Sequence, residues 1–188
     1  VVFSPDGSLV ASSSSAKDDV RVWDAETGQE VVHIPNDDGV YFVSFSPDGK
    51  KLVSAGSAMI SVWDIEDVLN NSRVVDNYNA GYRSPLAFSP DGKWVASEKC
   101  EPLGPEFGMP VCASSSVHIW DISTGQEISS ILHSDRINSI AFSSNGDRVV
   151  SGSKDGIVLV WETSTGNEIT RMAHKESVTS VRFSPNNK

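Results

Sequence analysis

The sequence predicts an all-β fold built from repeats of four short strands, and three observations support this. The string Phe-Ser-Pro-Asp-Gly recurs along the chain, a Trp-Asp pair follows it, and both return with a period of about 41 residues. The apolar residues fall in short alternating runs that end at turns, and no helical period of any length is visible. Because one four-stranded sheet buries little surface alone, neighbouring repeats must stack to form the core.

The Phe-Ser-Pro-Asp-Gly string marks the turn between the first and second strand of each repeat. The phenylalanines are separated by 42, 43, 54 and 41 residues. Proline presets φ at the second position of a type I turn, and glycine accepts the positive φ that follows, so each string predicts a tight turn. The complete and degenerate copies stand at Phe3–Gly7, Phe45–Gly49, Phe88–Gly92, Phe142–Gly146 and Phe183–Asn187.

A third strand in each repeat ends in tryptophan, and a fourth strand follows after a turn that in three repeats is Thr-Gly. The tryptophans are separated by 40, 57 and 41 residues, so this second marker shares the period of the first. They stand in the signature pairs Trp23-Asp24, Trp63-Asp64, Trp120-Asp121 and Trp161-Glu162. The predicted repeats span residues 1–34, 40–77, 84–132 and 137–173, with residues 178–184 as the first strand of a further repeat.

These motifs resemble the WD40-repeat family, whose members fold as β-propellers, and the resemblance covers essentially the whole chain. It implies four four-stranded blades, with strands a to d in chain order, plus one extra strand. Propellers of this family usually have about seven blades, so we expect the chain to be a section of a larger propeller. A four-bladed ring and closure with another chain are the alternatives. The wording Trp-Asp-Ala-Glu-Thr-Gly-Gln-Glu is similar to the regular WD40 arrays of fungal and bacterial signalling proteins.

The resemblance also implies a buried polar network of His, Asp, a Ser or Thr on strand b and the indole of the strand-c Trp. Only the fourth repeat carries the complete tetrad, namely His133, Ser151, Asp155 and Trp161. A buried carboxylate is costly unless several donors satisfy it, so we expect this blade to be the most rigid. The same residue types form the triad of serine hydrolases. Ser151 should lie inside a strand rather than on an exposed turn, so we expect no catalysis.

The third repeat is longer because of an insertion between strands b and c, roughly Glu98–Ser115. Three prolines and two glycines predict a loop there, on the face that carries the b–c and d–a turns. Propeller families resemble one another in using this loop face for partners. Phe107 and Met109 suit a protein-binding contact, or they fold back over the base of the loop. Cys100 and Cys112 either form a disulfide or remain two free thiols.

Composition and charge disfavour several classes of function. The formal net charge of −10 argues against nucleic acid and against docking on an anionic membrane. No His or third Cys stands at ligand spacing, so we expect no metal and no cofactor. Acidic side chains on the loop face could steer a basic peptide, or they are simply solvated loop charges. The candidate charged residues of this face are Asp18, Asp19, Asp37, Asp38, Glu98, Glu101 and Arg136.

Together these features predict a cytoplasmic, non-catalytic scaffold that presents its loop face to a protein or peptide. The alternative is a sensor or regulatory module of a larger signalling protein, such as a NACHT-type NTPase. A third class, an enzyme or small-molecule binder that uses the central channel, would need converging carboxylates or histidines on the first strands, and the sequence has no such cluster. The open edges of a propeller section are expected to pair with missing blades or with another chain.

Overall fold

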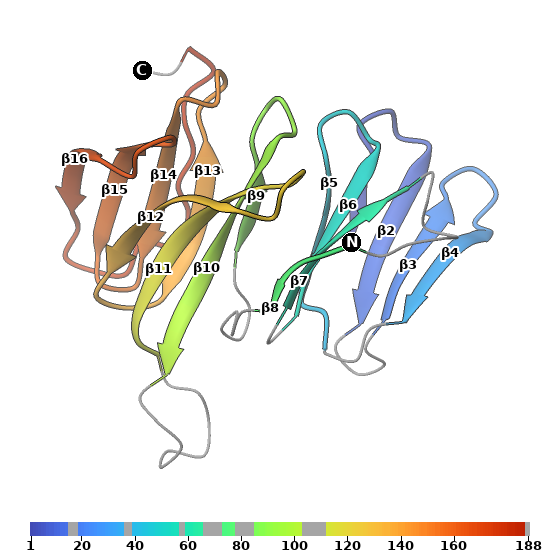
Figure 1. Cartoon of the computed structure of the whole chain (residues 1–188), viewed down its shortest axis with the longest axis horizontal. Helices are drawn as coiled ribbons and strands as arrows, with labels where there is room; N and C mark the ends of the chain where they lie inside the picture. The colour runs from blue at the N-terminus through green and yellow to red at the C-terminus, as the bar shows by residue number, and fades with distance from the viewer. Residues whose placement is uncertain are drawn as a thin grey trace. The chain divides into compact units, whose positions relative to one another are not determined.

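A computed structural model describes residues 1–14, 19–35, 39–56, 59–65, 73–77, 85–102 and 112–186. Every regular element in these ranges is a β-strand (Figure 1), which confirms the predicted all-β fold. The chain divides into two compact units, Val1–Arg83 and Ser84–Lys188, and each is treated below by itself. In the part of the chain that the structure describes, no helix is long and apolar enough to cross a membrane.

The N-terminal unit contains two four-stranded antiparallel sheets. The first sheet consists of β1 (Val2–Phe3), β2 (Leu9–Ser14), β3 (Asp19–Asp24) and β4 (Glu30–Pro35). The second consists of β5 (Phe42–Phe45), β6 (Lys51–Ala55), β7 (Met59–Asp64) and β8 (Arg73–Asn77). Strands that follow one another in sequence are neighbours in each sheet. The two sheets share one apolar core, in which Ala11 and Val22 of the first sheet join Val43 and Leu52 of the second.

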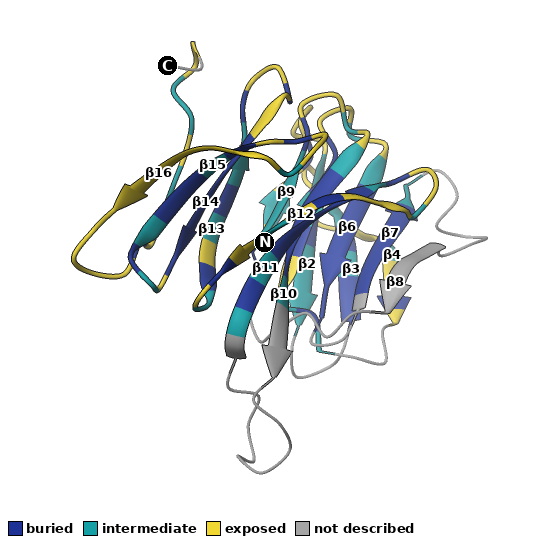
Figure 2. Ribbon diagram, turned by 60° about the vertical axis from the view of Figure 1, so that its left-hand side comes forward, coloured by how far each residue is buried: buried dark blue, intermediate teal, exposed yellow. Residues whose placement is uncertain are grey.

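The C-terminal unit repeats this arrangement with two further sheets. The third sheet consists of β9 (Leu86–Phe88), β10 (Trp94–Pro102), β11 (Cys112–Asp121) and β12 (Glu127–His133). The fourth consists of β13 (Ile137–Phe142), β14 (Arg148–Ser153), β15 (Ile157–Glu162) and β16 (Glu168–Ala173). Their shared core joins Ala96 and Ile119 to Ile137, Leu159 and Trp161. Burial is greatest in the inner strands, whereas β16 is exposed along its whole length (Figure 2).

A buried serine holds the a–b turn of every sheet in the same way. In the first sheet the Ser4 hydroxyl donates to Asp6 over 2.6 Å and accepts the amide of Leu9 over 2.9 Å. The hydrogen bonds from Ser4 and Ser8 lower the pKa of the Asp6 carboxyl to about 2. The turn glycine has a positive φ, 75° at Gly7, as the motif predicts. The equivalent serines are Ser46, Ser89 and Ser143, each with the same pair of contacts.

The acidic residue of the Trp-Asp pair closes the c–d turn. Asp24 accepts the amide and the hydroxyl of Thr27 over 2.7 Å and 2.8 Å. These bonds, with the backbone bond from Thr27 as the largest contribution, hold the pKa of Asp24 below its usual value. Asp121 accepts the amides of Ser123 and Thr124 in the corresponding turn of the third sheet. The signature acid is therefore a turn-stabilising residue rather than a candidate ligand-binding residue.

The insertion in the third repeat lengthens a hairpin, which corrects the expectation of a loop over Glu98–Ser115. Strand β10 continues to Pro102 and β11 begins at Cys112, and the two pair without interruption from Trp94–Asp121 to Glu101–Ser114. The strands can extend because Glu98–Glu101 and Cys112–Ser115, the two ends of the insertion, contain no proline or glycine. Residues 103–111, which include Phe107 and Met109, lie outside the described residues.

The segment 178–184 does not form the predicted extra strand, although its sequence resembles the first strand of a repeat. Val178 is buried, and it packs with Val150 and Val158 of the fourth sheet. A strand needs a neighbouring ladder, and none of the strands that the structure describes pairs with this segment. The segment lies so close to β14 that a Cβ at Gly152 would be 2.6 Å from a Val178 methyl group.

Candidate functional site

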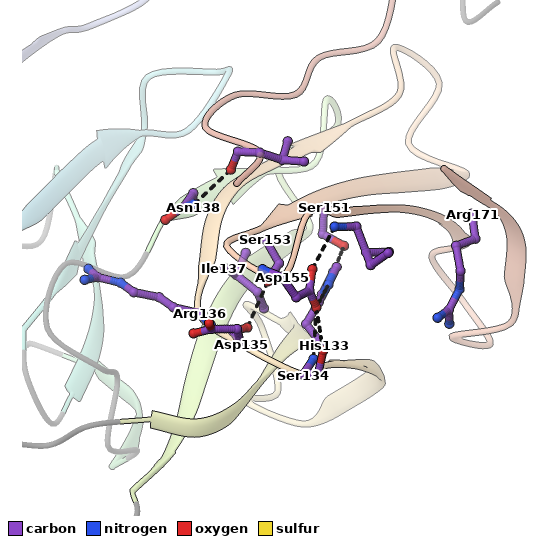
Figure 3. A network of polar contacts seen from close by, with 12 residues as sticks. His133, Ser134, Asp135, Arg136, Ile137, Asn138, Ser151, Ser153, Asp155 and Arg171 are labelled. Atoms are coloured by element: carbon purple, nitrogen blue, oxygen red, sulfur yellow. Dashed lines mark hydrogen bonds and ion pairs between the residues drawn. The ribbon is translucent and has the colours of Figure 1, made fainter. Parts of the chain in front are cut away.

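The structure brings together three members of the predicted tetrad on the loop side of the fourth sheet (Figure 3). His133 ends β12, Ser151 lies in β14, and Asp155 stands in the turn between β14 and β15. The His133 Nε2 atom is 2.8 Å from the Ser151 Oγ, and its Nδ1 atom is 3.4 Å from Oδ2 of Asp155. The network therefore joins the last strand of the third sheet to strand β14 and to the β14–β15 turn of the fourth.

Asp155 is the hub of this network because it accepts from three directions. Its Oδ2 atom accepts the amide and the hydroxyl of Ser134, both over 3.0 Å, and its Oδ1 atom accepts the amide of Ile157 over 2.8 Å. Burial raises the pKa of the Asp155 carboxyl, but the amides of Ile157 and Ser134, together with the smaller contributions of the Ser134 hydroxyl and His133, outweigh this effect. The pKa of Asp155 therefore lies below its usual value, and the group is an anion at neutral pH.

His133 is a neutral imidazole at neutral pH. Burial lowers the pKa of His133 below its ordinary value, and the nearby Asp155 carboxylate only partly opposes this. Since Nδ1 faces the carboxylate, we assign the ring proton to that atom. Nε2 then accepts the hydroxyl proton of Ser151. This tautomer directs the ring N–H at the carboxylate, although the 3.4 Å contact falls short of hydrogen-bond geometry.

Trp161, the fourth member of the tetrad, is buried but takes no part in the hydrogen bonding. In the other three sheets the strand-c indole donates to the strand-b serine, and Trp23 reaches Ser12 over 2.9 Å. The same bond joins Trp63 to Ser54 and Trp120 to Ser97. The serine of the fourth sheet is used by the histidine instead, and among the described residues the Trp161 indole nitrogen has no hydrogen-bond partner.

The order of contacts from Ser151 through His133 to Asp155 is that of a serine-hydrolase triad. A nucleophile must reach its substrate, however, and the Ser151 residue is 0% exposed and His133 is 2% exposed. Ser151 also points into the sheet from the middle of β14 rather than from an exposed turn. The geometry supports a structural role in which the three side chains hold strands and turn together.

A charged rim, formed by Asp135, Arg136 and Lys154, lies on the turns beside this network, and Figure 3 labels Asp135 and Arg136. The backbone carbonyl of Arg136 accepts the amide of Lys154 over 2.8 Å, and that of Asp135 accepts the Ser153 hydroxyl over 3.0 Å. The Lys154 ammonium lies 3.9 Å from the Asp135 carboxylate. Arg136, one of the predicted loop-face residues, is half-buried and stands on a turn whose backbone is held by a hydrogen bond.

The sequence analysis predicts Glu98 to be an exposed acid of the loop face, and this prediction is wrong. It is 2% exposed, and its Oε1 atom accepts the amide of Ile137 over 2.9 Å. The side chain therefore links β10 of the third sheet to β13 of the fourth and is closed to a partner. Sequence reasoning missed this role, although one signal was present. Glu98 directly follows Ser97 on strand b, in a stretch that continues the strand once the insertion is recognised as a hairpin.

Asp19 of the first sheet is also buried, with 5% of its surface exposed. It is therefore not available for contact with a partner. Its carboxylate lies 3.0 Å from Arg21 Nε and 3.3 Å from His33 Nε2. The hydrogen bond from Arg21 is the main reason why the pKa of Asp19 is lowered. Sequence reasoning also missed that Arg21 bonds Glu30 and lies over the Trp23 ring.

Several other predicted site residues cannot be placed from the described part of the chain. Asp18, Asp37 and Asp38 lie outside it, and only the backbone is described at Glu101, Cys100 and Cys112. Cys100 is opposite Ser115 in the ladder, whereas Cys112 is opposite Pro102. Two residues along a strand cover roughly 7 Å, so this register does not favour a disulfide, which remains a prediction.

The sequence profile described as "WD domain, G-beta repeat" matches residues 1–24, 28–64, 86–121 and 125–162. The chain belongs to the WD40-repeat family. The predicted resemblance is thereby confirmed, as are the four-stranded antiparallel blades of a WD40 β-propeller section. WD40 proteins act in general as scaffolds for other proteins, and this general function is the one that the family supports for the chain.

Similar WD40 proteins match only part of this chain. The chain is 35% identical over 86 residues to WD repeat-containing protein 1 of Gallus gallus, covering 43% of the chain and 13% of the relative. It is 40% identical over 68 residues to small ribosomal subunit protein RACK1 of Caenorhabditis elegans, covering 36% and 20%. A WD repeat-containing protein 26 homolog of Drosophila melanogaster is 29% identical over 125 residues, covering 63% and 18%. The chain thus spans a fifth or less of the length of these relatives.

Proposed function

We propose that the chain is a non-catalytic scaffold that binds a protein or peptide partner on the face of its b–c and d–a turns. The observation that carries this proposal is the charged rim above the fourth-blade network. Asp135, Arg136 and Lys154 stand on turns whose backbones are bonded to one another, so their side chains leave the backbone at fixed positions. A backbone that is already fixed loses little conformational entropy on binding, which favours a specific contact.

The described part of this face carries both signs of charge. Lys154 lies 3.9 Å from Asp135, Arg136 is the next residue along the chain, and Lys175 and Glu176 follow β16 on the next turn. A partner that reads this rim must therefore offer a mixed pattern of acidic and basic side chains. The proposal of a basic peptide steered by acidic loops rests on Asp18, Asp37, Asp38 and Glu101, which continue the same face in the sequence.

The test is affinity capture from a lysate with the chain and two matched charge-reversal variants, read by quantitative mass spectrometry. The loop-face variant combines Arg136→Glu with Lys154→Glu. The control is Lys93→Glu, which reverses a lysine that is 72% exposed on an a–b turn of the same unit. We expect a set of proteins that the control retains and the loop-face variant loses. Equal capture by all three forms would refute the use of this face.

The role of the insertion in binding is best tested by a deletion shorter than Glu98–Ser115. Removal of Glu98–Ser115 would cut into β10 and β11 and would delete the buried Glu98 carboxylate. Replacement of residues 103–111 by an Asn-Gly turn keeps the described hairpin. Loss of the same captured proteins would support a role for the insertion, whereas unchanged capture would remove the insertion from the binding site.

We keep as a second proposal that this array is the regulatory module of a larger signalling protein, such as a NACHT-type NTPase. It is supported by the regular Trp-Asp-x-x-Thr-Gly-Gln-Glu wording of two repeats. The sequence that adjoins the array in the full-length protein tests it directly. A nucleotide-binding module there would support it, and the absence of one would refute it.

A further inference from the structure

A pocket of about 290 Å³ lies where the third and fourth sheets meet, at the end of the sheets that carries the a–b and c–d turns. Trp94 at the start of β10 lines it from the third sheet, and two turns and the outer strand of the fourth sheet supply the other walls. The binding face proposed above lies on the b–c and d–a turns, at the opposite end of the strands. The pocket is therefore a separate site, and its volume suits a ligand of about the size of one amino acid.

Hydrogen bonds hold the two turns of the fourth sheet that form one wall of this pocket. Thr163, which is 1% exposed, donates its hydroxyl to the Gly146 carbonyl over 2.7 Å and its amide to the Asp147 carbonyl over 3.0 Å. The carbonyl of Thr163 accepts the hydroxyl of Ser129 in β12 over 2.5 Å. The two turns are thus tied to each other and to the third sheet. A ligand enters a pocket whose backbone is already ordered, which lowers the entropic cost of binding.

Two apolar side chains line the pocket. Trp94 is half-buried and packs against the core that the third and fourth sheets share, and Ile169 of β16 is 49% exposed. The position of Trp94 is occupied in the other repeats by Leu9, Lys51 and Arg148, so the aromatic ring is specific to this repeat. The ring and the branched side chain offer a surface that gains free energy when an apolar group covers it.

Two opposite charges on neighbouring strands also line the pocket. Arg148, the first residue of β14, stands directly opposite Glu162 at the end of β15, and both are exposed. In the second sheet the same ladder positions hold Lys51 and Asp64, whose Nζ and Oδ2 atoms form an ion pair over 3.2 Å. Among the described residues, by contrast, no carboxylate lies within ion-pair distance of the Arg148 guanidinium. The fourth sheet therefore presents separately the two charges that the second sheet joins.

A second carboxylate, that of Asp147, completes the charged lining. Its Oδ2 atom accepts the side-chain amide of Asn145 over 2.8 Å, and Oε2 of Glu162 accepts the hydroxyl of Thr165 over 2.5 Å. Each of these bonds uses one oxygen of its carboxylate. A purely cationic ligand would meet the guanidinium of Arg148, and a purely anionic ligand would meet the two carboxylates. The lining is complementary to a small ligand that carries both charges and an apolar group.

We propose that this pocket binds a free α-amino acid with a large apolar side chain. The ligand carboxylate pairs with the Arg148 guanidinium, whose planar donors suit bidentate contact, and the ligand ammonium pairs with Glu162 and Asp147. The ligand side chain lies on Trp94 and Ile169. A single carbon separates the two charged groups of an amino acid, and the Cβ atoms of directly opposite strand residues are about 4.5–5.5 Å apart. One molecule can therefore reach both charges.

Isothermal titration calorimetry of the chain with three related ligands tests the proposal. The ligands are L-phenylalanine, N-acetyl-L-phenylalanine, which lacks the ammonium, and L-phenylalaninamide, which lacks the carboxylate. We expect L-phenylalanine to bind and each blocked form to bind about tenfold or more weakly, because each loses one charged contact. A residue within a peptide or at its end offers at most one of these charges. Equal binding of either blocked form, or no binding of L-phenylalanine up to its solubility limit, overturns the proposal.

Substitution of the exposed Arg148 locates the site without disturbing the core. Arg148→Gln should weaken the binding of L-phenylalanine by about tenfold or more and leave the binding of L-phenylalaninamide unchanged, because the amide has no carboxylate to lose. The matched control is Lys51→Gln, which removes the cation at the same ladder position of the second sheet and should leave L-phenylalanine binding unchanged. Equal weakening by the two variants, or equal weakening of both ligands by Arg148→Gln, overturns the assignment.

Discussion

Replacement of Asp155 by alanine tests the fourth-blade network most directly. The change removes the acceptor of the Ile157 amide at 2.8 Å and leaves the His133 ring, whose side chain is 0% exposed, without its carboxylate. A buried donor left without a partner costs about 1–3 kcal/mol. The two donors of Ser134 are exposed and can turn to water, so they add little. The expected loss in the free energy of unfolding for these two donors is therefore about 2–6 kcal/mol.

Urea unfolding followed by circular dichroism measures this loss, and hydrogen exchange locates it. We expect exchange to accelerate in the β14–β15 turn and at the end of β12 before it changes elsewhere. The matched control is Asp135→Ala, which removes a partly exposed carboxylate from the same rim and should change stability by less than about 0.5 kcal/mol. A loss below about 0.5 kcal/mol for Asp155→Ala would show that the network does not hold the blade.

Three further predictions follow from the same unit. Stability should fall as pH drops below 6.5, the ordinary pKa of His133. Burial lowers the pKa of His133 in the folded chain, so unfolding takes up a proton in this range. A His133→Gln variant titrated in parallel should lack this step. The stability contributed by the lowered pKa of Asp155 is lost only below pH 3.8. Glu98→Ala should lower the free energy of unfolding, measured in urea or by heating, by about 1–3 kcal/mol. Glu98→Gln keeps an acceptor for the Ile137 amide of β13 and should lower it less. Equal losses in the two variants would contradict the hydrogen bond. A double-mutant cycle between Trp120→Phe and alanine at its strand-b serine should give a coupling of about 1 kcal/mol, and the same cycle at Trp161 should give almost none.

The sequence predicts those parts of the fold that depend on local chemistry. The Phe-Ser-Pro-Asp-Gly turns follow from the fixed φ of proline and the positive φ of glycine, and the tryptophan strands follow from the repeat itself. The contacts among His133, Ser151 and Asp155 could be anticipated because all three stand at fixed distances from the repeat markers. The structure places Nε2 of His133 2.8 Å from the Ser151 hydroxyl and Nδ1 3.4 Å from the Asp155 carboxylate.

The remaining features depend on contacts between sheets, which no local pattern reveals. A glutamate between two strand residues has the same sequence appearance whether it faces water or an amide of the next sheet, so Glu98 was misplaced. Composition likewise predicts a loop for the insertion, because prolines and glycines dominate its centre and mask the pairing of its two ends. The indole of Trp161 differs from the other three because His133 competes for its serine, and only the geometry shows which donor wins.

The close approach at Gly152 has a consequence for how such repeats diverge after duplication. The residue that follows the strand-b serine is Ser13, Ala55, Glu98 and Gly152 in the four blades, so this one position differs in every copy. In the third blade it must reach a neighbouring amide, and in the fourth it must leave room for Val178. The copies share their signature and yet cannot be exchanged. A recombination that swapped the third and fourth repeats would force a carboxylate into the space that Val178 fills, so these two repeats are not interchangeable at this position.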